Sequence, residues 1–148
     1  MRFDAFDQFS NQQVLAGPFA QVSTNSKKKP AAQDLGIGLA DMGAAIFIDQ
    51  GALGGTGTDL TIELIEATDD ALTTSITSLA SMTIAKTALV DGVMFFLGLP
   101  GYLMSKEYFG VRFTPVGGTI TGKINAYYGS KDDVAKYKSF NTSYVVKN

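Results

Sequence analysis

The stretch from Lys106 to Tyr128 constrains the fold most, because its apolar and polar residues alternate with a period of two. Two sets of apolar residues each fall on one face: Phe109, Val111 and Phe113, then Ile120, Ile124 and Ala126. Strand side chains point alternately to opposite faces, so the pattern predicts two strands, each with one face towards a core. The segment Pro115 to Gly118 lies between them, and we interpret it as the connection of a β-hairpin.

Further short strands are predicted before this stretch, at 44–49, 59–67, 80–85 and 93–99. Glycine-rich or acidic turns separate them, at 51–58, 69–73 and 91–92. In the second of these strands Ile65 interrupts the alternation, which predicts a bulge near Leu64 and Ile65. Val93 to Leu99 is apolar on both faces, as in a strand covered by its own core and by a neighbour. Together these segments predict an all-β fold, a jelly-roll-like antiparallel β-sandwich.

Both ends of the chain differ from this body, and we expect extended N- and C-terminal arms. Residues 1–33 are predicted to form an N-terminal arm and loop, residues 34–130 the sandwich domain, and residues 131–148 a C-terminal tail. Aromatic residues recur among polar ones in both arms: Phe3, Phe6 and Phe9, then Tyr137, Phe140 and Tyr144. Such side chains bring a large contact area to a partner, although the tail can equally fold back on its own domain. We interpret the run Lys27 to Lys29 as part of a solvated loop.

Composition excludes several kinds of active site. The 148 residues include no cysteine and no histidine, which rules out disulfides, thiolate metal sites and Ser-His-Asp or Cys-His catalysis. The close carboxylate pairs are Asp69-Asp70, Asp132-Asp133 and Glu63/Glu66, and none has the spacing of a calcium loop. The glycines at 51–58 are not followed by the lysine of a phosphate-binding loop. We therefore predict no enzyme activity, no cofactor and no metal.

Charge and hydropathy address possible partners. The net charge is −2, whereas binding to phosphate backbones needs a basic face, so we expect no nucleic-acid partner. The longest nearly apolar run, Val93 to Met104, is too short to span a bilayer, and we expect no membrane partner. Met1 to Ser10 lacks the apolar core of a signal peptide, so we expect synthesis in the cytoplasm of the host cell.

Several segments resemble, in order, a tailed-phage capsid cement (decoration) protein family whose type member comes from a Bordetella phage. They are the start of the chain with Phe3, Phe9 and Ser10-Asn11-Gln12, and the segments 34–38, 57–64, 68–71, 97–100 and 113–122. The resemblance covers about residues 1–128. The lysines at 27–29 and the tail 131–148 have no counterpart in it.

The resemblance implies a jelly-roll protein on the outer surface of an icosahedral virion, where it clamps neighbouring major capsid subunits. The expected partners are the major capsid protein and a second copy of the chain, as a homodimer, with a trimer left open. We expect capsid or subunit contacts from eight aromatic residues: Phe3, Phe6, Phe9, Phe95, Phe96, Tyr137, Phe140 and Tyr144.

The sequence leaves two other functions to compare with this one. A carbohydrate-binding jelly-roll module of a phage or bacterial surface structure would need exposed aromatics over polar residues in a groove. Its candidate residues are Tyr102, Tyr108 and Tyr127. A small glycosidase would need two suitably separated carboxylates, and the sequence offers no pair with supporting catalytic residues.

Overall fold

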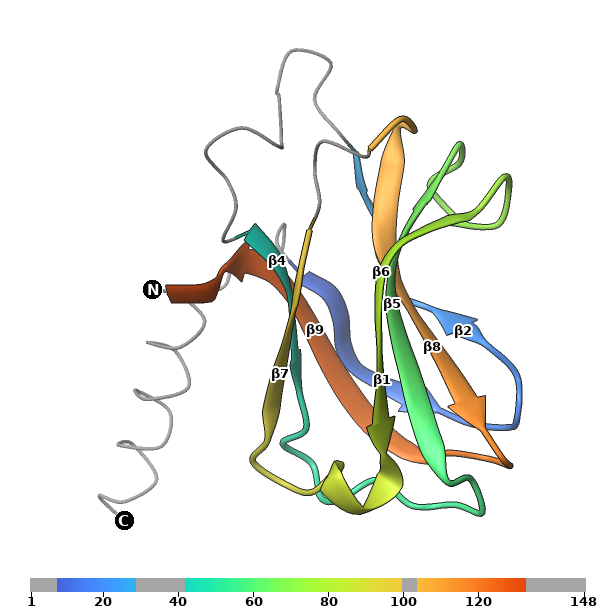
Figure 1. Ribbon diagram of the computed structural model, residues 1–148, viewed down its shortest axis with the longest axis vertical. Coiled ribbons are helices and arrows are strands. Elements are labelled where there is room, and N and C mark those ends of the chain that lie inside the picture. The colour runs from blue at the N-terminus through green and yellow to red at the C-terminus, as the bar shows by residue number, and fades with distance from the viewer. Residues whose placement is uncertain (1–7, 29–41, 100–103, 133–148) are drawn as a thin grey trace.

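The computed structural model describes residues 8–28, 42–99 and 104–132, and in these ranges the regular elements are almost all strands (Figure 1). The strands are β1 (Gln8–Leu15), β2 (Gln21–Val22), β3 (Lys27–Lys28), β4 (Met42–Phe47), β5 (Asp59–Ala67), β6 (Thr77–Ala85), β7 (Met94–Gly98), β8 (Tyr108–Val116) and β9 (Gly122–Ser130). One short 3₁₀ helix, η2 (Lys86–Ala88), connects β6 to β7. Two antiparallel sheets pack face to face, which confirms the predicted β-sandwich.

Strand order identifies the sandwich as a jelly roll. Sheet A has the order β1-β9-β4-β7, and sheet B has the order β2-β8-β5-β6, with β3 also paired to β8. Because β2 and β3 pair with successive parts of β8, they act as two halves of one edge strand. The paired strands are then nested along the chain. Strand β1 pairs with β9, the β2/β3 edge with β8, β4 with β7, and β5 with β6. Two four-strand layers with nested antiparallel pairs are the arrangement of a jelly roll.

The predicted hairpin between β8 and β9 is wrong, because these strands lie in different sheets. The connection crosses from sheet B to sheet A, and it is held against the 54–58 segment by the Gly57 N–H, which donates to the Thr119 carbonyl at 2.7 Å. Gly117 and Gly118 have φ of 74° and 147°, and a Cβ on Gly118 would lie 2.7 Å from Thr56 Oγ1. The glycines therefore serve a close crossing between layers. Alternation shows that a strand has an apolar face but does not determine its pairing partner.

Residues 8–28 do not form an arm, which corrects the predicted boundary at residue 34. Strand β1 pairs with β9 at the edge of sheet A, and β2 and β3 pair with β8. Phe9 and Leu15 of β1 are buried in the core. The remaining residues assigned to the arms, 1–7 and 29–33, and those of the tail from residue 133, lie outside the described ranges.

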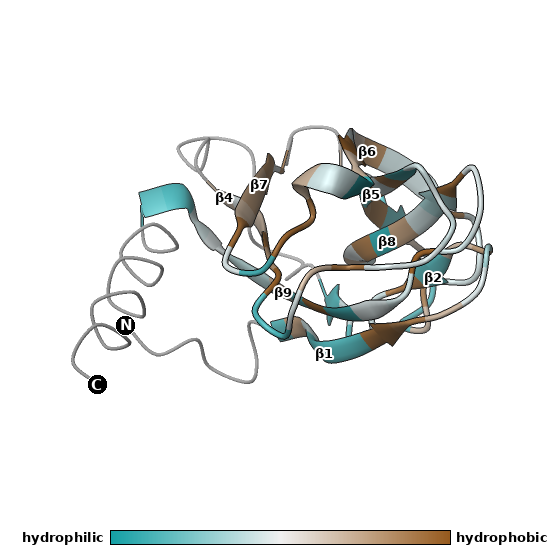
Figure 2. Ribbon diagram, turned by 90° about the horizontal axis from the view of Figure 1, so that it is seen from below, coloured by the Kyte–Doolittle hydropathy of each residue, from teal (hydrophilic) through white to brown (hydrophobic). Residues whose placement is uncertain are grey.

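The core lies between the sheets, and the alternating residues of the Lys106–Tyr128 stretch point into it as predicted. All six are at most 2% exposed: Phe109, Val111, Phe113, Ile120, Ile124 and Ala126. Seen from below, hydrophobic segments appear on strands of both layers (Figure 2). A register shift occurs at Leu64–Ile65, as predicted, but the extra residue is Leu79 of β6. Ile65 keeps its place on the outer face of β5, where it packs with Ala67 and Leu72 in a smaller cluster.

Candidate interaction surfaces

Phe9 was expected to contact a capsid, but the structure places it in the core. Its side chain is 0% exposed. Its ring meets Phe109 and Tyr128 edge to face, with centroids 5.8 and 6.1 Å apart. Phe9 therefore stabilises the sandwich and presents no surface to a partner. The other arm residues predicted to make contacts, Phe3, Phe6, Tyr137, Phe140 and Tyr144, lie outside the described residues.

Phe95 and Phe96 are neighbours in β7 and point to opposite faces of sheet A. Phe95 packs against the main core and is partly buried. Phe96 lies on the outer face, in a cluster that we call the outer patch: Ala45, Phe47, Met94, Phe96 and Tyr127. Residues 93–99 were predicted to be covered on both faces. The core covers the inner face, whereas Met94 and Phe96 on the outer face are partly exposed.

Three adjacent strands build the outer patch. The sheet register aligns Ala45 of β4 with Phe96 of β7 on one side and with Tyr127 of β9 on the other. Phe47 meets Tyr127 edge to face, with ring centroids 5.8 Å apart. Gly43 allows the Phe96 ring to approach β4, because a Cβ there would lie 2.9 Å from Phe96 Cζ. The tyrosine hydroxyl accepts a hydrogen bond from Gln8 Nε2 at 3.3 Å, so one polar group borders an otherwise apolar surface.

Sequence reasoning missed Phe47, Met94 and Tyr127 as members of this surface. The sequence did carry a signal for an apolar outer face. Ala45 and Phe47 alternate with the inward residues of β4, and Tyr127 follows the inward residues Ile124 and Ala126 of β9 on the opposite face. An aromatic residue on the outer face of a strand is informative only when its lateral neighbours are also apolar. Those neighbours are set by pairing between distant segments.

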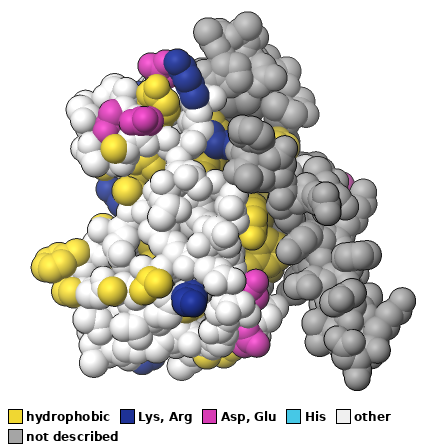
Figure 3. All heavy atoms as spheres, turned by 180° about the vertical axis from the view of Figure 1, so that it is seen from behind, with side chains coloured by type: hydrophobic (Ala, Val, Ile, Leu, Met, Phe, Trp, Pro, Cys, Tyr) yellow, Lys and Arg dark blue, Asp and Glu magenta, His cyan; other side chains and the backbone are white. Residues whose placement is uncertain are grey.

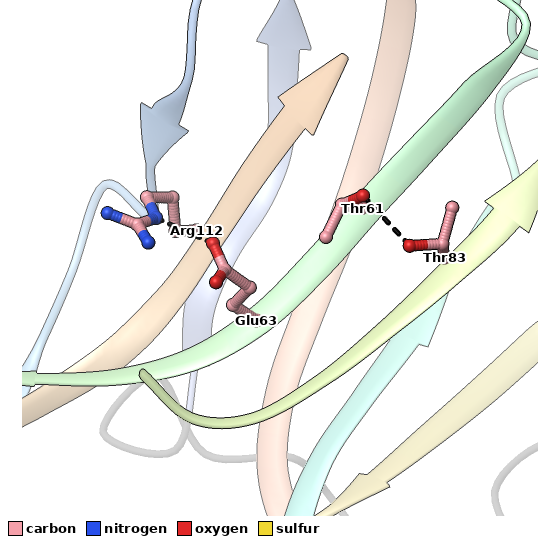
Figure 4. A network of polar contacts seen from close by, with 4 residues as sticks. All are labelled: Thr61, Glu63, Thr83 and Arg112. Carbon is pink, nitrogen blue, oxygen red and sulfur yellow. Dashed lines mark hydrogen bonds and ion pairs between the residues drawn. The ribbon is translucent and has the colours of Figure 1, made fainter. Parts of the chain in front are cut away.

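The outer face of sheet B carries polar contacts beside its small apolar cluster of Ile65, Ala67 and Leu72. Arg112 Nε donates to Glu63 Oε2 at 2.7 Å, and Thr61 and Thr83 share a hydrogen bond of 2.9 Å across β5 and β6 (Figure 4). Arg112 lowers the pKa of the Glu63 carboxyl, chiefly through this hydrogen bond. Thus Glu63 is held as an ionised structural partner of a cation.

The other candidate carboxylates also have structural roles. Glu66 points to the opposite face from Glu63 and is 1% exposed. Its oxygens accept hydrogen bonds from the backbone N–H groups of Ser105 and Lys106 at 2.8 and 3.0 Å. The Thr73 hydroxyl donates to Asp69 Oδ2 at 2.6 Å, and this bond is the main cause that lowers the pKa of Asp69. The N–H groups of Thr73 and Thr74 also donate to this carboxylate, at 3.0 and 2.7 Å. Both carboxylates therefore organise loops.

Among the described residues, no group of three or more acidic side chains is placed to hold a metal ion. No helix in the described ranges is long and apolar enough to cross a membrane. Seen from behind, charged side chains are scattered, without a continuous patch of either sign (Figure 3).

Tyr108 and Tyr127, proposed above for a sugar groove, are far apart in the architecture. Tyr108 belongs to the outer cluster of sheet B, and Tyr127 belongs to the outer patch of sheet A. Because the two sheets form opposite layers, these rings cannot line one groove. Tyr102 lies outside the described residues.

Comparison with known proteins gives no family assignment: no family model and no curated protein matches this chain.

Proposed function

We propose that this chain is a capsid decoration protein, which binds the outer surface of an icosahedral tailed-phage head and clamps neighbouring major capsid subunits. The observation that carries the proposal is the outer patch, in which Met94, Phe96 and Tyr127 are partly exposed over the buried Ala45 and Phe47 on the outer face of sheet A. Aromatic residues and methionine are enriched at protein interfaces, and contiguous apolar patches mark such sites. The jelly-roll fold is also the one that the family resemblance implies.

The proposed mechanism is stabilisation by binding. A protein that binds only where several capsid subunits have their assembled positions lowers the free energy of the closed shell relative to free subunits. Many copies on a symmetric lattice add their contributions, so no single contact has to be strong. This function needs a rigid body and a contact surface, and it involves no cofactor and no reaction. The protein would reside on the outer surface of the virion.

Cosedimentation with phage heads tests the proposal. Heads are assembled from the major capsid protein encoded with this chain, without the chain itself, and purified protein is added before pelleting. We expect the protein to pellet with heads, to leave free capsid subunits unbound, and to raise the temperature at which heads open. The double variant Met94→Ser/Phe96→Ser should weaken binding by roughly tenfold or more, because interface aromatic residues often contribute over 1 kcal/mol each.

Phe19→Ser is the matched control, because Phe19 is an exposed apolar residue outside the patch, 78% exposed in the loop before β2. It should leave head binding unchanged. If Phe19→Ser lost head binding and Met94→Ser/Phe96→Ser kept it, the capsid contact would not lie on the outer patch of sheet A. Failure of the unaltered protein to bind heads, together with binding to a glycan array, would replace the decoration role with carbohydrate recognition.

A further inference from the structure

The two flanks of the sandwich, where the sheets end, differ in how well they resist strand pairing. On one flank, β1 has register shifts on both sides of Ser10, and Gln12 has φ of 47°. Beside it, β2 and β3 have only two residues each, and β3 consists of Lys27 and Lys28. Bulged, very short or charged edges are the usual protection against pairing with another chain.

The opposite flank, formed by β6 and β7, lacks this protection. Each strand ends its sheet there (Figure 1). Neither Thr77–Ala85 nor Met94–Gly98 contains a charged residue or a proline. In the described part of the chain, β5 is the one strand that pairs with β6. Leu79 is the extra residue at the register shift, so the regular free edge runs from Ala80 to Ala85.

Apolar side chains remain only partly buried along this flank. They pack on the core from β6 and from the start of β7: Leu79, Ala80, Met82, Val93 and Phe95. An added strand next to β6 would satisfy its free backbone groups and cover part of this apolar surface. Addition of a strand to an open sheet edge is a common mode of protein recognition.

We propose that β6 pairs antiparallel with β6 of a second copy of this chain, around a two-fold axis at Met82. A partner strand must itself have a free edge of similar length without like charges. Within the described ranges, β6 meets that requirement for itself, because it carries no charge and an antiparallel self-pair is symmetric. The pairing would join the two B sheets into one continuous sheet.

The register of this pair follows from the axis. Ala80 would face Ile84 of the second copy on the inner side, and Met82 would face its own counterpart. On the outer side, Ser81 would face Thr83 of the second copy, twice by symmetry. Ser81 and Thr83 are exposed in the single chain, and neither belongs to the outer patch. Loss of pairing is therefore separable from loss of head binding.

Sedimentation equilibrium of two charge variants of the full chain tests this register. In Ser81→Lys/Thr83→Lys, like charges face each other across the axis at both contacts. In Ser81→Lys/Thr83→Glu, opposite charges face each other. Like charges directly opposite each other destabilise a strand pair, and both contacts of the first variant are of this kind, so we expect its dimer dissociation constant to rise roughly tenfold. The second should stay within about threefold of the unaltered protein by the same reasoning.

Equal melting temperatures at low concentration, where both variants are monomeric, will show that each still folds. Amide hydrogen exchange should be slowed between Ala80 and Ala85 when the unaltered protein dimerises. Two results would overturn the proposal. One is an unaltered protein that stays monomeric at 100-fold the concentration of the melting experiment. The other is equal dimerisation by the two charge variants. Protection of β6 that occurs only on phage heads would also overturn the proposal, and would identify a capsid strand as the occupant.

Discussion

At the residue scale, burial decides what each ion pair contributes. Arg112 and Glu63 approach to 2.7 Å with side chains 27% and 15% exposed. Lys28 and Glu107 are equally close, at 2.7 Å, but their side chains are 63% and 51% exposed. Water and salt screen an exposed pair almost completely, so we expect only the pair on sheet B to stabilise the fold measurably.

Arg112→Met tests this expectation through its pH dependence. Because Arg112 depresses the folded-state pKa of Glu63, the carboxylate adds stability above its unfolded-state pKa, and that stability is lost as pH falls through the folded-state value. Urea unfolding should show a loss of about 1 kcal/mol at pH 7 and a smaller loss below about pH 4. Glu107→Gln should change neither value. A loss that is the same at both pH values would indicate missing packing instead of a missing ion pair.

At the element scale, the Leu72 side chain packs the 68–76 segment against sheet B and fills a gap above Gly110. Leu72 is 1% exposed, and a Cβ on Gly110 of β8 would lie 2.4 Å from its Cδ1. Leucine rarely adopts the positive φ of 56° seen at Leu72, so its packing must outweigh that strain. The segment and the strand are thus matched in shape.

A double-mutant cycle at Leu72 and Gly110 measures the packing energy that couples these two positions. Gly110→Ala should destabilise the protein by about 2 kcal/mol through overpacking, and Leu72→Ala by about 3 kcal/mol through a cavity. The double variant should lose at least about 1 kcal/mol less than the sum, because the shorter side chain leaves room for the new methyl group. Gly98→Ala is the control, since a Cβ there meets nothing within 4 Å. Additive losses would mean that Gly110 is needed for another reason, such as its approach to Ser23.

The same scale shows what the sequence could predict. Alternation located β5, β8 and β9 and their inward residues, because one buried face repeats every second position. It could not assign partners, so β8 and β9 were wrongly joined as a hairpin. Strand β1 was missed because Gln12 interrupts its alternation and the Gln13 side chain, although buried, is polar and donates to the Val22 carbonyl at 2.8 Å. Of the outer patch, only Phe96 was predicted, since the cluster exists only once β4, β7 and β9 are paired.

At the scale of the whole molecule, β1 is the first strand of the sandwich in the described part of the chain, and this changes where the chain can be shortened. Deletion of residues 1–7 should leave cooperative unfolding intact, because β1 starts at Gln8. Deletion of residues 1–15 removes the buried Phe9 and Leu15 and should cost at least about 4 kcal/mol, close to the whole stability of many domains. Thermal unfolding followed by circular dichroism distinguishes the two. If the longer deletion melted like the full chain, β1 would not be part of the folded body.

The nesting of the strands also has a mechanical consequence. Gln8 at the start of β1 lies opposite Tyr127, near the end of β9, so the start of β1 and the end of β9 lie side by side at one edge of the sandwich. Tension applied between them would load the β1–β9 hydrogen bonds one after another, as in opening a zipper. We expect a low rupture force in this direction, with the inner ladders coming under load only after β1 has peeled away.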